Sequence, residues 1–380
     1  MKLLEYQAKA VLSSLGIAIP PGKVAPTPDE AAEACEQLGP VAVKAQVPVG
    51  GRGKAGGIKL ARTPSEARAA AEQIIGMDIK GFKVPLVYCE AALEIAREIY
   101  LGFTVDRDAR ANILMLSAKG GMDIEQVAGE SPGSIARLYP NPWRGPLDFE
   151  LTQLIFDADL GDLARPLGSV IKKLYRAIPE FDALTAEINP LVVTTSGAVV
   201  AGDAKLEIDD NAAWRHKDLE DRYGSVLEGD PYEVEAKKRH LTYVSLDGEV
   251  GIIGNGAGLC MGTLDLVQRA GGRPANFCDI GGGAKAEVVE NALAVILMNP
   301  KVRGVLINVF GGITRGDEVA RGIVTARDNL KMQLPLVVRL SGTNEEEGRE
   351  ILRRSGIEPG VNAWAAAQKI VELTRAGARA

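Results

Sequence analysis

The sequence predicts two domains of mixed α and β structure, an α+β domain followed by an α/β domain with a doubly wound parallel sheet. The chain has 380 residues, more than a single hydrophobic core usually supports. Strands and helices alternate irregularly in the first half, whereas the second half repeats strand then helix. Glycine, proline and acidic residues are mixed at 224–237, so we expect a linker there and domains at 1–229 and 230–380.

In the first half, short apolar runs predict strands and amphipathic stretches predict helices. The predicted strands are residues 41–44, 86–90, 99–105 and 112–117, and the predicted helices are residues 29–38 and 64–75. This pattern is typical of an α+β domain that contains hairpins.

The second half repeats one unit, a buried strand followed by a helix. The predicted strands are residues 250–253, 275–277, 305–309 and 336–340, and the predicted helices are residues 258–270, 286–298, 317–329 and 344–355. Repeated units of this kind indicate a parallel sheet, which binds ligands at the carboxyl ends of its strands. The glycine-rich sequences GNGAG, DIGGGA, NVFGGITRGD and SGTN lie at these ends.

Composition and charge narrow the class of protein. The formal net charge of −6 argues against bulk attraction to nucleic acid or to anionic membranes. The four cysteines, Cys35, Cys89, Cys260 and Cys278, have no C-x-x-C spacing and are expected to be reduced. The sequence has no signal-peptide core and no run of ~20 apolar residues. We expect a cytoplasmic protein, or one of the mitochondrial matrix if the chain is eukaryotic.

The most informative segment is the glycine-rich loop at residues 43–58, which also carries Lys44, Arg52 and Lys54. Glycines let backbone N–H groups approach an anion, and the cations neutralise its charge, so the loop is typical of a phosphate site. It differs from a P-loop because Ala55 replaces the metal-binding hydroxyl. Any Mg²⁺ must therefore be held elsewhere. The alternative is a solvated basic turn.

A predicted hairpin supplies candidate metal ligands. Two apolar strands flank a turn centred on Ser196, which places Asn189 opposite Asp203 and Glu187 opposite Lys205. The period of two along a strand puts these four side chains on one face. An amide oxygen beside a carboxylate suits Mg²⁺, which takes one or two protein ligands plus phosphate and water. The alternative is an ordinary polar surface, and the proline after Asn189 could shift the register.

Two further features suggest ligand binding. Glu90 ends one predicted strand and Glu98 starts another, and a carboxylate near a nucleotide can accept ribose hydroxyls, although alone such residues are usually on the surface. In the second half, Gly311 and Gly312 lead from a strand toward a helix. The N-terminus of a helix favours a phosphate or a carboxylate, but glycines also occur in such turns for geometry alone.

Other motifs argue against different chemistries. The sequence IIGNGAGL begins like a dinucleotide-binding G-x-G-x-x-G motif but has Leu259 in place of the third glycine. The acidic residue expected about 20 positions on, Asp279, is followed by three glycines. A dinucleotide-binding dehydrogenase therefore stays a distant alternative. His216 and His240 lie in charged segments without acidic partners, so we expect them at the surface or the core edge.

Several motifs together resemble one family. The sequences LLEYQAKAVLSSLGI, VKAQVPVGGRGKAGGIKL, EINPLVV, GNGAGLCMGTLDLV, GGRPANF, DIGGGA and NVFGGITRGD occur in the order and spacing of the succinyl-CoA synthetase (succinate–CoA ligase) β subunit, ADP-forming type. The resemblance covers nearly the whole chain. It implies an N-terminal ATP-grasp domain followed by a flavodoxin-like CoA-ligase domain.

The resemblance also implies roles for individual residues. The nucleotide-binding positions would be Lys44, Gly51, Arg52, Gly53, Glu90, Leu93 and Glu98. The Mg²⁺ ligands would be Asn189 and Asp203. The succinate contacts would be Asn255, Gly312, Ile313 and Thr314. Glu187 would be the catalytic carboxylate that positions a phosphohistidine at the nucleotide site.

The reaction implied by the resemblance is succinyl-CoA + ADP + phosphate ⇌ succinate + CoA + ATP, a step of the tricarboxylic acid cycle. It passes through succinyl phosphate and a phosphohistidine of an α subunit, which also binds most of the CoA, so this chain alone would be catalytically incomplete. Pro20 matches the ATP-preferring form, whereas Leu93 stands where some relatives carry a polar residue. A malate–CoA ligase β subunit and a nucleotide-sensing scaffold remain alternatives.

Overall fold

The computed structural model describes residues 1–223, 230–282, 285–312, 314–357 and 359–376. The chain forms two compact units, Met1–Leu227 and Glu228–Ala380. The first six residues of the predicted linker, 224–229, and the predicted domain boundary at 229 lie outside the described residues. The rest of that stretch was predicted wrongly, because Pro231–Lys238 form helix α9. Asp230 caps this helix by accepting from the backbone N–H groups of its first turn.

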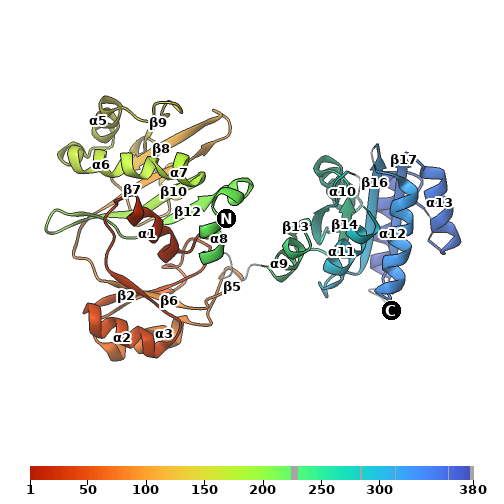
Figure 1. Cartoon of the computed structure of the whole chain (residues 1–380), viewed down its shortest axis with the longest axis horizontal. Helices are drawn as coiled ribbons and strands as arrows, with labels where there is room; N and C mark the ends of the chain where they lie inside the picture. The colour runs from red at the N-terminus through yellow and green to blue at the C-terminus, as the bar shows by residue number, and fades with distance from the viewer. Residues whose placement is uncertain (224–229, 283–284, 313, 358, 377–380) are drawn as a thin grey trace. The chain divides into compact units, whose positions relative to one another are not determined.

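The first unit begins with a four-stranded antiparallel sheet in the order β1-β6-β2-β3. Its strands are β1 (Gly22–Ala25), β6 (Val87–Ala91), β2 (Val41–Ala45) and β3 (Ile58–Ala61). Helices α2 (Pro28–Leu38) and α3 (Pro64–Ile74) pack side by side against this sheet (Figure 1). Each helix begins with a threonine N-cap followed by proline, which explains why the sequence located both correctly.

A second, antiparallel sheet follows in the order β11-β10-β7-β8-β9, with β12 also paired to β10. Its strands are β7 (Ile95–Asp106), β8 (Ala111–Ser117), β9 (Ala136–Leu138), β10 (Ala183–Thr194), β11 (Val199–Ala201) and β12 (Lys205–Ile208). The helices of this part are α1 (Glu5–Ser14), α4 (Ile124–Glu130), α5 (Asp148–Asp157), α6 (Ala164–Tyr175), α7 (Ala177–Phe181) and α8 (Lys217–Tyr223). The first unit therefore contains hairpins, such as β7–β8 and β10–β11, as predicted.

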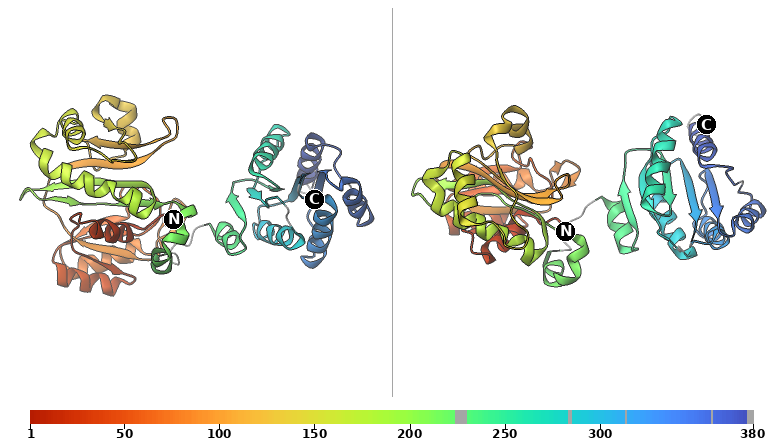
Figure 2. Two further views of the ribbon diagram at one scale, coloured as in Figure 1. Left: turned by 45° about the horizontal axis from the view of Figure 1, so that its top comes forward. Right: turned by 90° about the horizontal axis from the view of Figure 1, so that it is seen from above.

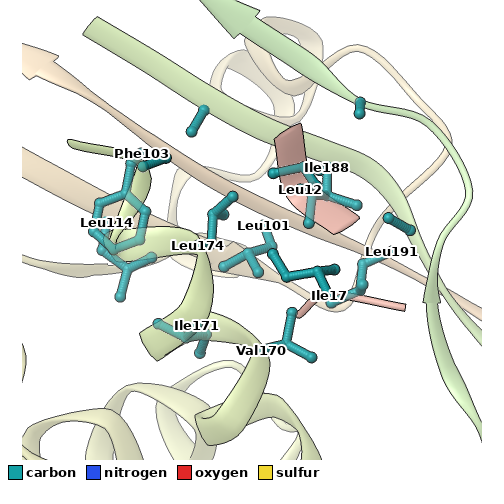
Figure 3. Packing of buried hydrophobic residues seen from close by; sticks show 14 of the residues in the cluster. Leu12, Ile17, Leu101, Phe103, Leu114, Val170, Ile171, Leu174, Ile188 and Leu191 are labelled. Atoms are coloured by element: carbon teal, nitrogen blue, oxygen red, sulfur yellow. The ribbon is translucent and has the colours of Figure 1, made fainter. Parts of the chain in front are cut away.

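The core of this part lies between the second sheet and its helices (Figure 3). Helix α6 contributes Val170, Ile171 and Leu174, which pack with Leu101 and Phe103 of strand β7. Helix α1 adds further apolar side chains on the same cluster. Because α1 belongs to this core, its charged residues are held at a fixed place beside the sheet.

The hairpin of strands β10, β11 and β12 confirms the predicted pairing of Glu187 with Lys205, whereas the predicted pairing of Asn189 with Asp203 is not part of the ladder. Val193 pairs with Val199 and Glu187 pairs with Lys205, so the turn is centred on Ser196. Gly197 in this turn has φ +83°, a conformation that favours glycine. The ladder is interrupted between these pairs, and the stretch around the cis Asn189–Pro190 bond lies in the interruption.

The second unit has a five-stranded sheet in the order β13-β15-β14-β16-β17, covered by helices on both faces (Figure 2). Its strands are β13 (Thr242–Ser245), β15 (Asn276–Asp279), β14 (Val250–Gly254), β16 (Gly304–Gly311) and β17 (Leu336–Gly342). Helices α10 (Ala257–Arg269) and α14 (Ala363–Ala376) share one apolar cluster with the sheet, and α11 (Ala286–Leu297), α12 (Gly316–Asn329) and α13 (Glu345–Arg354) share another. The doubly wound prediction is confirmed for β14 to β17. The sheet is not wholly parallel, because the edge strand β13, absent from the sequence prediction, is antiparallel.

The four cysteines are free and buried, as expected. Burial raises the pKa of the Cys89, Cys260 and Cys278 thiols to about 12. Within the described ranges, no helix has the length and apolar character that a membrane span requires.

Candidate functional site

The glycine-rich loop joins strands β2 and β3 and folds back on itself. The N–H groups of Ala55, Gly56 and Gly57 donate to the carbonyls of Gly51, Gly53 and Arg52 at 3.2, 3.0 and 2.8 Å. These three donors are therefore used inside the loop. The backbone N–H groups of Gly51, Arg52 and Gly53, the loop positions assigned by resemblance to the nucleotide, are not among them.

Lys44, on strand β2, is buried among carboxylates and is not displayed on a solvated turn. Its Nζ donates to Glu5 Oε1 at 2.8 Å, to Glu90 Oε2 at 2.6 Å and to the Gly202 carbonyl at 2.6 Å. Burial alone would lower the pKa of Lys44, but Glu5 and Glu90 outweigh burial and hold it well above its usual range. The lysine therefore stays charged, and its three acceptors come from segments that are far apart in the sequence.

Glu5, near the start of helix α1, connects the cations of this region. Its side chain is 1% exposed and pairs with Lys9 at 3.0 Å, Lys44 at 2.8 Å and Arg52 at 2.7 Å. Burial works to raise the pKa of Glu5, yet these cations hold it well below its usual range. Glu5 and Lys9 were not among the predicted site residues. The available signal was a charged pair spaced i,i+4 in a helix whose neighbouring positions are apolar.

Arg52 of the glycine-rich loop joins Glu5 to Asp203. Its Nη1 donates to Glu5 Oε2 at 2.7 Å and to the Ala45 carbonyl at 3.1 Å. Its Nη2 donates to both carboxylate oxygens of Asp203 at 2.7 Å each. Burial would lower the pKa of Arg52, and the two carboxylates raise it instead. The structure thus brings the loop cation and the predicted metal ligand into direct contact across 151 residues.

We call the six linked side chains the buried charge cluster. Its members are Glu5, Lys9, Lys44, Arg52, Glu90 and Asp203. The cluster holds three cations and three carboxylates, so its formal charge is zero. A buried cluster of this kind is stable only while its members stay paired.

The two predicted ribose-binding glutamates lie in different environments. Glu90 is buried, and its oxygens contact Lys9 and Lys44, so the interpretation of a surface residue is wrong for it. Burial raises the pKa of Glu90 despite these lysines. Glu98 is exposed and lies inside strand β7, not at its start. A Cβ added to Gly121 would come within 2.6 Å of Glu98 Oε2, so this loop glycine packs directly on the glutamate.

Asn189 ties strand β10 to the loop that follows β8. Its Oδ1 accepts from Gly121 N and its Nδ2 donates to the Met122 carbonyl, both at 2.8 Å. The pKa of the neighbouring Glu187 is raised, chiefly by burial. Lys205 lowers this pKa, whereas the carboxylates of Glu125 and Asp203 raise it further. Leu93 is half-buried between strands β6 and β7.

The donor atoms of Asn189 and Asp203 suit Mg²⁺ in their chemistry. Within the described ranges, no group of three His, Cys, Asp or Glu side chains is placed to hold a metal ion. Mg²⁺ takes only one or two protein oxygens and completes its coordination with phosphate and water, so an amide oxygen and a carboxylate are donors that it accepts. The guanidinium between the two Asp203 oxygens shows that this carboxylate already holds a positive charge there.

In the second unit, Asn255 joins the ends of two parallel strands. Its side chain exchanges two hydrogen bonds of 2.9 Å with the backbone of Phe310 and donates to Thr314 Oγ1 at 3.2 Å. Gly312 is exposed, and its carbonyl accepts from Thr343 Oγ1 at 2.9 Å. The predicted contacts Asn255, Gly312 and Thr314 thus lie at one edge of the sheet, while Ile313 lies outside the described residues.

The helix-terminus interpretation of Gly312 needs correction. Helix α12 begins at Gly316, four residues later, and the buried Asp317 carboxylate occupies its first turn. That carboxylate is paired with Arg315 and Arg321 at 3.0 Å each. The negative charge at this terminus therefore comes from the chain itself, and Gly312 belongs to the preceding turn.

The structure also shows the partners of Asp279 and His216. Asp279 Oδ1 accepts from Gly256 N at 2.6 Å and Gly281 N at 2.8 Å, so this carboxylate fixes the glycine turn instead of being free for a ribose. The prediction that His216 has no acidic partner is wrong. His216 is buried at the core edge, and its Nε2 lies 2.8 Å from Asp182 Oδ2.

Comparison with known proteins places both units. Residues 2–193 match the ATP-grasp domain family and residues 253–370 match the CoA-ligase family. The "Succinate--CoA ligase [GDP-forming] subunit beta" of Thermus thermophilus is 51% identical over 98% of this chain and 99% of its own length. The chain belongs to the succinate–CoA ligase β-subunit family. The ADP-forming β subunits of Rubrobacter xylanophilus and Roseiflexus are 49% and 48% identical, each over 99% of this chain and all of the relative.

A solved structure supports the fold of this succinate–CoA ligase β-family chain. ATP citrate lyase from Methanothrix soehngenii, in complex with citrate and coenzyme A, is 20% identical, covers 99% of both chains and has a TM-score of 0.73. The ATP-grasp match ends at residue 193, whereas Asp203, which Arg52 contacts, lies beyond it. The buried charge cluster therefore extends past the matched part of the domain.

Proposed function

We propose that this chain is the β subunit of a succinate–CoA ligase that catalyses succinyl-CoA + ADP + phosphate ⇌ succinate + CoA + ATP. The observation that carries the proposal is the assembly of Lys44, Arg52 and Asp203 at one place in the ATP-grasp unit. Near-full-length identity to named succinate–CoA ligase β subunits supports the same reaction.

In the nucleotide half of the reaction, Lys44 and Arg52 bind the phosphates. Charge-assisted hydrogen bonds from both cations hold the phosphoryl group in place as its charge redistributes. Gly51 and Gly53 offer backbone N–H groups beside them, and Glu90 keeps Lys44 charged and oriented. Mg²⁺, when bound at Asn189 and Asp203, would neutralise charge on the nucleotide phosphates.

The remaining nucleotide contacts are assigned by position. Glu98, on strand β7, lies against Gly121 of the loop that Asn189 anchors, and we assign it to the ribose. Leu93 lies between strands β6 and β7, and we assign it to the base. We propose adenine as the base. The relatives support either choice, because the Thermus protein is named GDP-forming and the Rubrobacter protein ADP-forming.

In the acyl half, Asn255, Gly312, Ile313 and Thr314 are assigned to succinate. The partner is an α subunit that carries the phosphohistidine and binds most of the CoA, which the "subunit beta" names of the relatives support. Glu187 receives that histidine at the nucleotide site. Because burial raises the pKa of Glu187, its carboxyl is suited to exchange a hydrogen bond with an imidazole. We propose a cytoplasmic location, which the free cysteines support.

The test is reconstitution of this chain with a succinate–CoA ligase α subunit. We expect CoA-dependent formation of ATP from succinyl-CoA, ADP and phosphate, with ADP used better than GDP. Succinate compared with malate decides between the two CoA ligases. Tight NADH binding without binding of MgATP would support the dehydrogenase instead. Nucleotide binding without any CoA-dependent phosphate exchange would support a nucleotide-sensing scaffold.

A further inference from the structure

Arg52 lies where a cation bound to Asp203 would lie. One nitrogen, Nη2, is 2.7 Å from each oxygen of the Asp203 carboxylate, and Asp203 Oδ1 also accepts from Ala204 N at 2.7 Å. The Arg52 side chain is 8% exposed, whereas that of Asp203 is 28% exposed. The Asp203 side chain is therefore more open to solvent than the guanidinium that it holds.

We propose that Arg52 occupies the cation position of Asp203 in the nucleotide-free state and is exchanged for the divalent cation when the nucleotide binds. This inference rests on the proposed function, since it takes Asp203 as a metal ligand. A guanidinium and a metal ion cannot both lie between the same two oxygens. A metal ion that takes this position between the two oxygens therefore requires Arg52 to turn away, and the nucleotide phosphates offer the released guanidinium a new acceptor.

The charges of the buried charge cluster favour replacement of Arg52 by the metal ion over binding of the metal ion beside Arg52. The cluster is formally neutral, so a divalent ion that joined it without displacing Arg52 would raise its charge to +2, whereas exchange for Arg52 would raise it only to +1. When Arg52 turns toward a phosphate, the Asp203 carboxylate becomes free for the metal. The Arg52 guanidinium then neutralises charge on the nucleotide. Metal and nucleotide then favour each other's binding, and thermodynamic linkage makes this coupling reciprocal.

The loop restricts the exchange to the arginine side chain. The Arg52 carbonyl accepts from Gly57 N at 2.8 Å, which fixes the backbone at this point. Gly57 itself is tightly enclosed, because an added Cβ would lie 2.9 Å from Ile79 Cδ1 and 3.0 Å from Ala45 Cβ. The backbone is therefore held, while the long side chain can rotate between Asp203 and the nucleotide.

The test measures binding of Mn²⁺, as the probe for the divalent site, to the complex with the α subunit in the absence of nucleotide. Free Mn²⁺ is followed by electron paramagnetic resonance. We expect Arg52→Gln to bind Mn²⁺ about tenfold more tightly than wild type and ADP about tenfold more weakly. Lys54→Gln is the matched control, because it removes the same charge from the same loop at an exposed position that has no contact with Asp203 in the structure. We expect no change in its Mn²⁺ binding.

Asp203→Asn separates failure of this inference from failure of the proposed function. If Asp203→Asn loses Mn²⁺ binding but Arg52→Gln binds it no more tightly than wild type, the exchange is wrong and the metal site stands. If Asp203→Asn binds Mn²⁺ normally, both are wrong. Should Arg52→Gln fail to fold, anomalous scattering from wild-type crystals soaked in Mn²⁺ decides. We expect Arg52 turned away from Asp203 where manganese is bound, and manganese beside an undisplaced Arg52 would overturn the inference.

Discussion

Replacement of Glu5 by glutamine tests whether the buried charge cluster stabilises the first unit. Glu5 is 1% exposed and contacts Lys9, Lys44 and Arg52, so its loss leaves three cations facing two carboxylates. Removing one member of a buried ionic network typically costs about 3–5 kcal/mol. Glutamine keeps part of the hydrogen bonding, so we expect about 3 kcal/mol, the low end of this range. For a unit of 227 residues this corresponds to a fall in Tm of about 6–12 °C.

The assay is thermal unfolding of the purified chain, followed by calorimetry so that the transitions of the two units are separated. The transition of the first unit should fall and that of the second should stay. Glu36→Gln is the matched control at an exposed position of helix α2 and should change stability by less than about 0.5 kcal/mol. Adding Lys9→Met to Glu5→Gln restores charge balance and should recover part of the loss. A Glu5→Gln protein that melts within about 1 °C of wild type would refute the reasoning.

Four further outcomes are expected. The pKa of Glu5 is lowered in the folded state, so the contribution of Glu5 to the free energy of unfolding is complete above the ordinary pKa of 4.5 and is lost as the pH falls below that value. The Tm difference between wild type and Glu5→Gln should therefore shrink under acid. A constant difference from pH 7 to 3 would contradict this. Asp203→Ala should raise the KM for MgADP more than about tenfold and lower the Tm less than Glu5→Gln does, because Asp203 is the most exposed carboxylate of the buried charge cluster, and an unchanged Mg²⁺ dependence would count against the metal assignment. Gly57→Ala should weaken ADP binding measured by calorimetry, because its Cβ would lie 2.9 Å from Ile79 Cδ1; normal affinity would show that the loop can yield. Gly312→Asp should block phosphoryl transfer from the α subunit by charge, because no atom lies within 4 Å of the added Cβ to create a clash; wild-type transfer would remove Gly312 from the site.

The sequence predicted the parts of the fold that depend on neighbouring residues, such as helix caps and hairpin turns. The threonine and proline at the starts of helices α2 and α3 cap them within the chain's own first turn, so both helices were located to within one residue. The turn at Ser196 fixed the register of Glu187 and Lys205 because hairpin pairing depends only on nearby residues. Strand β13 was missed because its four residues include two polar side chains and lie at an edge, where little hydrophobic pattern is required.

The candidate site was predictable only in part. Lys44, Arg52 and Asp203 were identified from loop and hairpin chemistry, but their direct contacts join segments up to 158 residues apart. Glu5 and Lys9 carried only the weak signal of an i,i+4 charge pair, because nothing near them along the chain shows that they face two other cations and a second glutamate. Pairing of this kind depends on the packing of α1 against two sheets, which no local pattern specifies.

The neutrality of the buried charge cluster connects stability with catalysis. A phosphate site made only of Lys44 and Arg52 would be a buried pair of like charges before nucleotide arrives, and burial without partners would be costly. Glu5, Glu90 and Asp203 remove that cost by serving as internal acceptors. The same carboxylates must then compete with the nucleotide for these cations. The ion pair made by the most exposed carboxylate is therefore the easiest to break. Asp203 is that member, with its side chain 28% exposed against 1% for Glu5 and 3% for Glu90, and it is also the member with the donor chemistry for Mg²⁺.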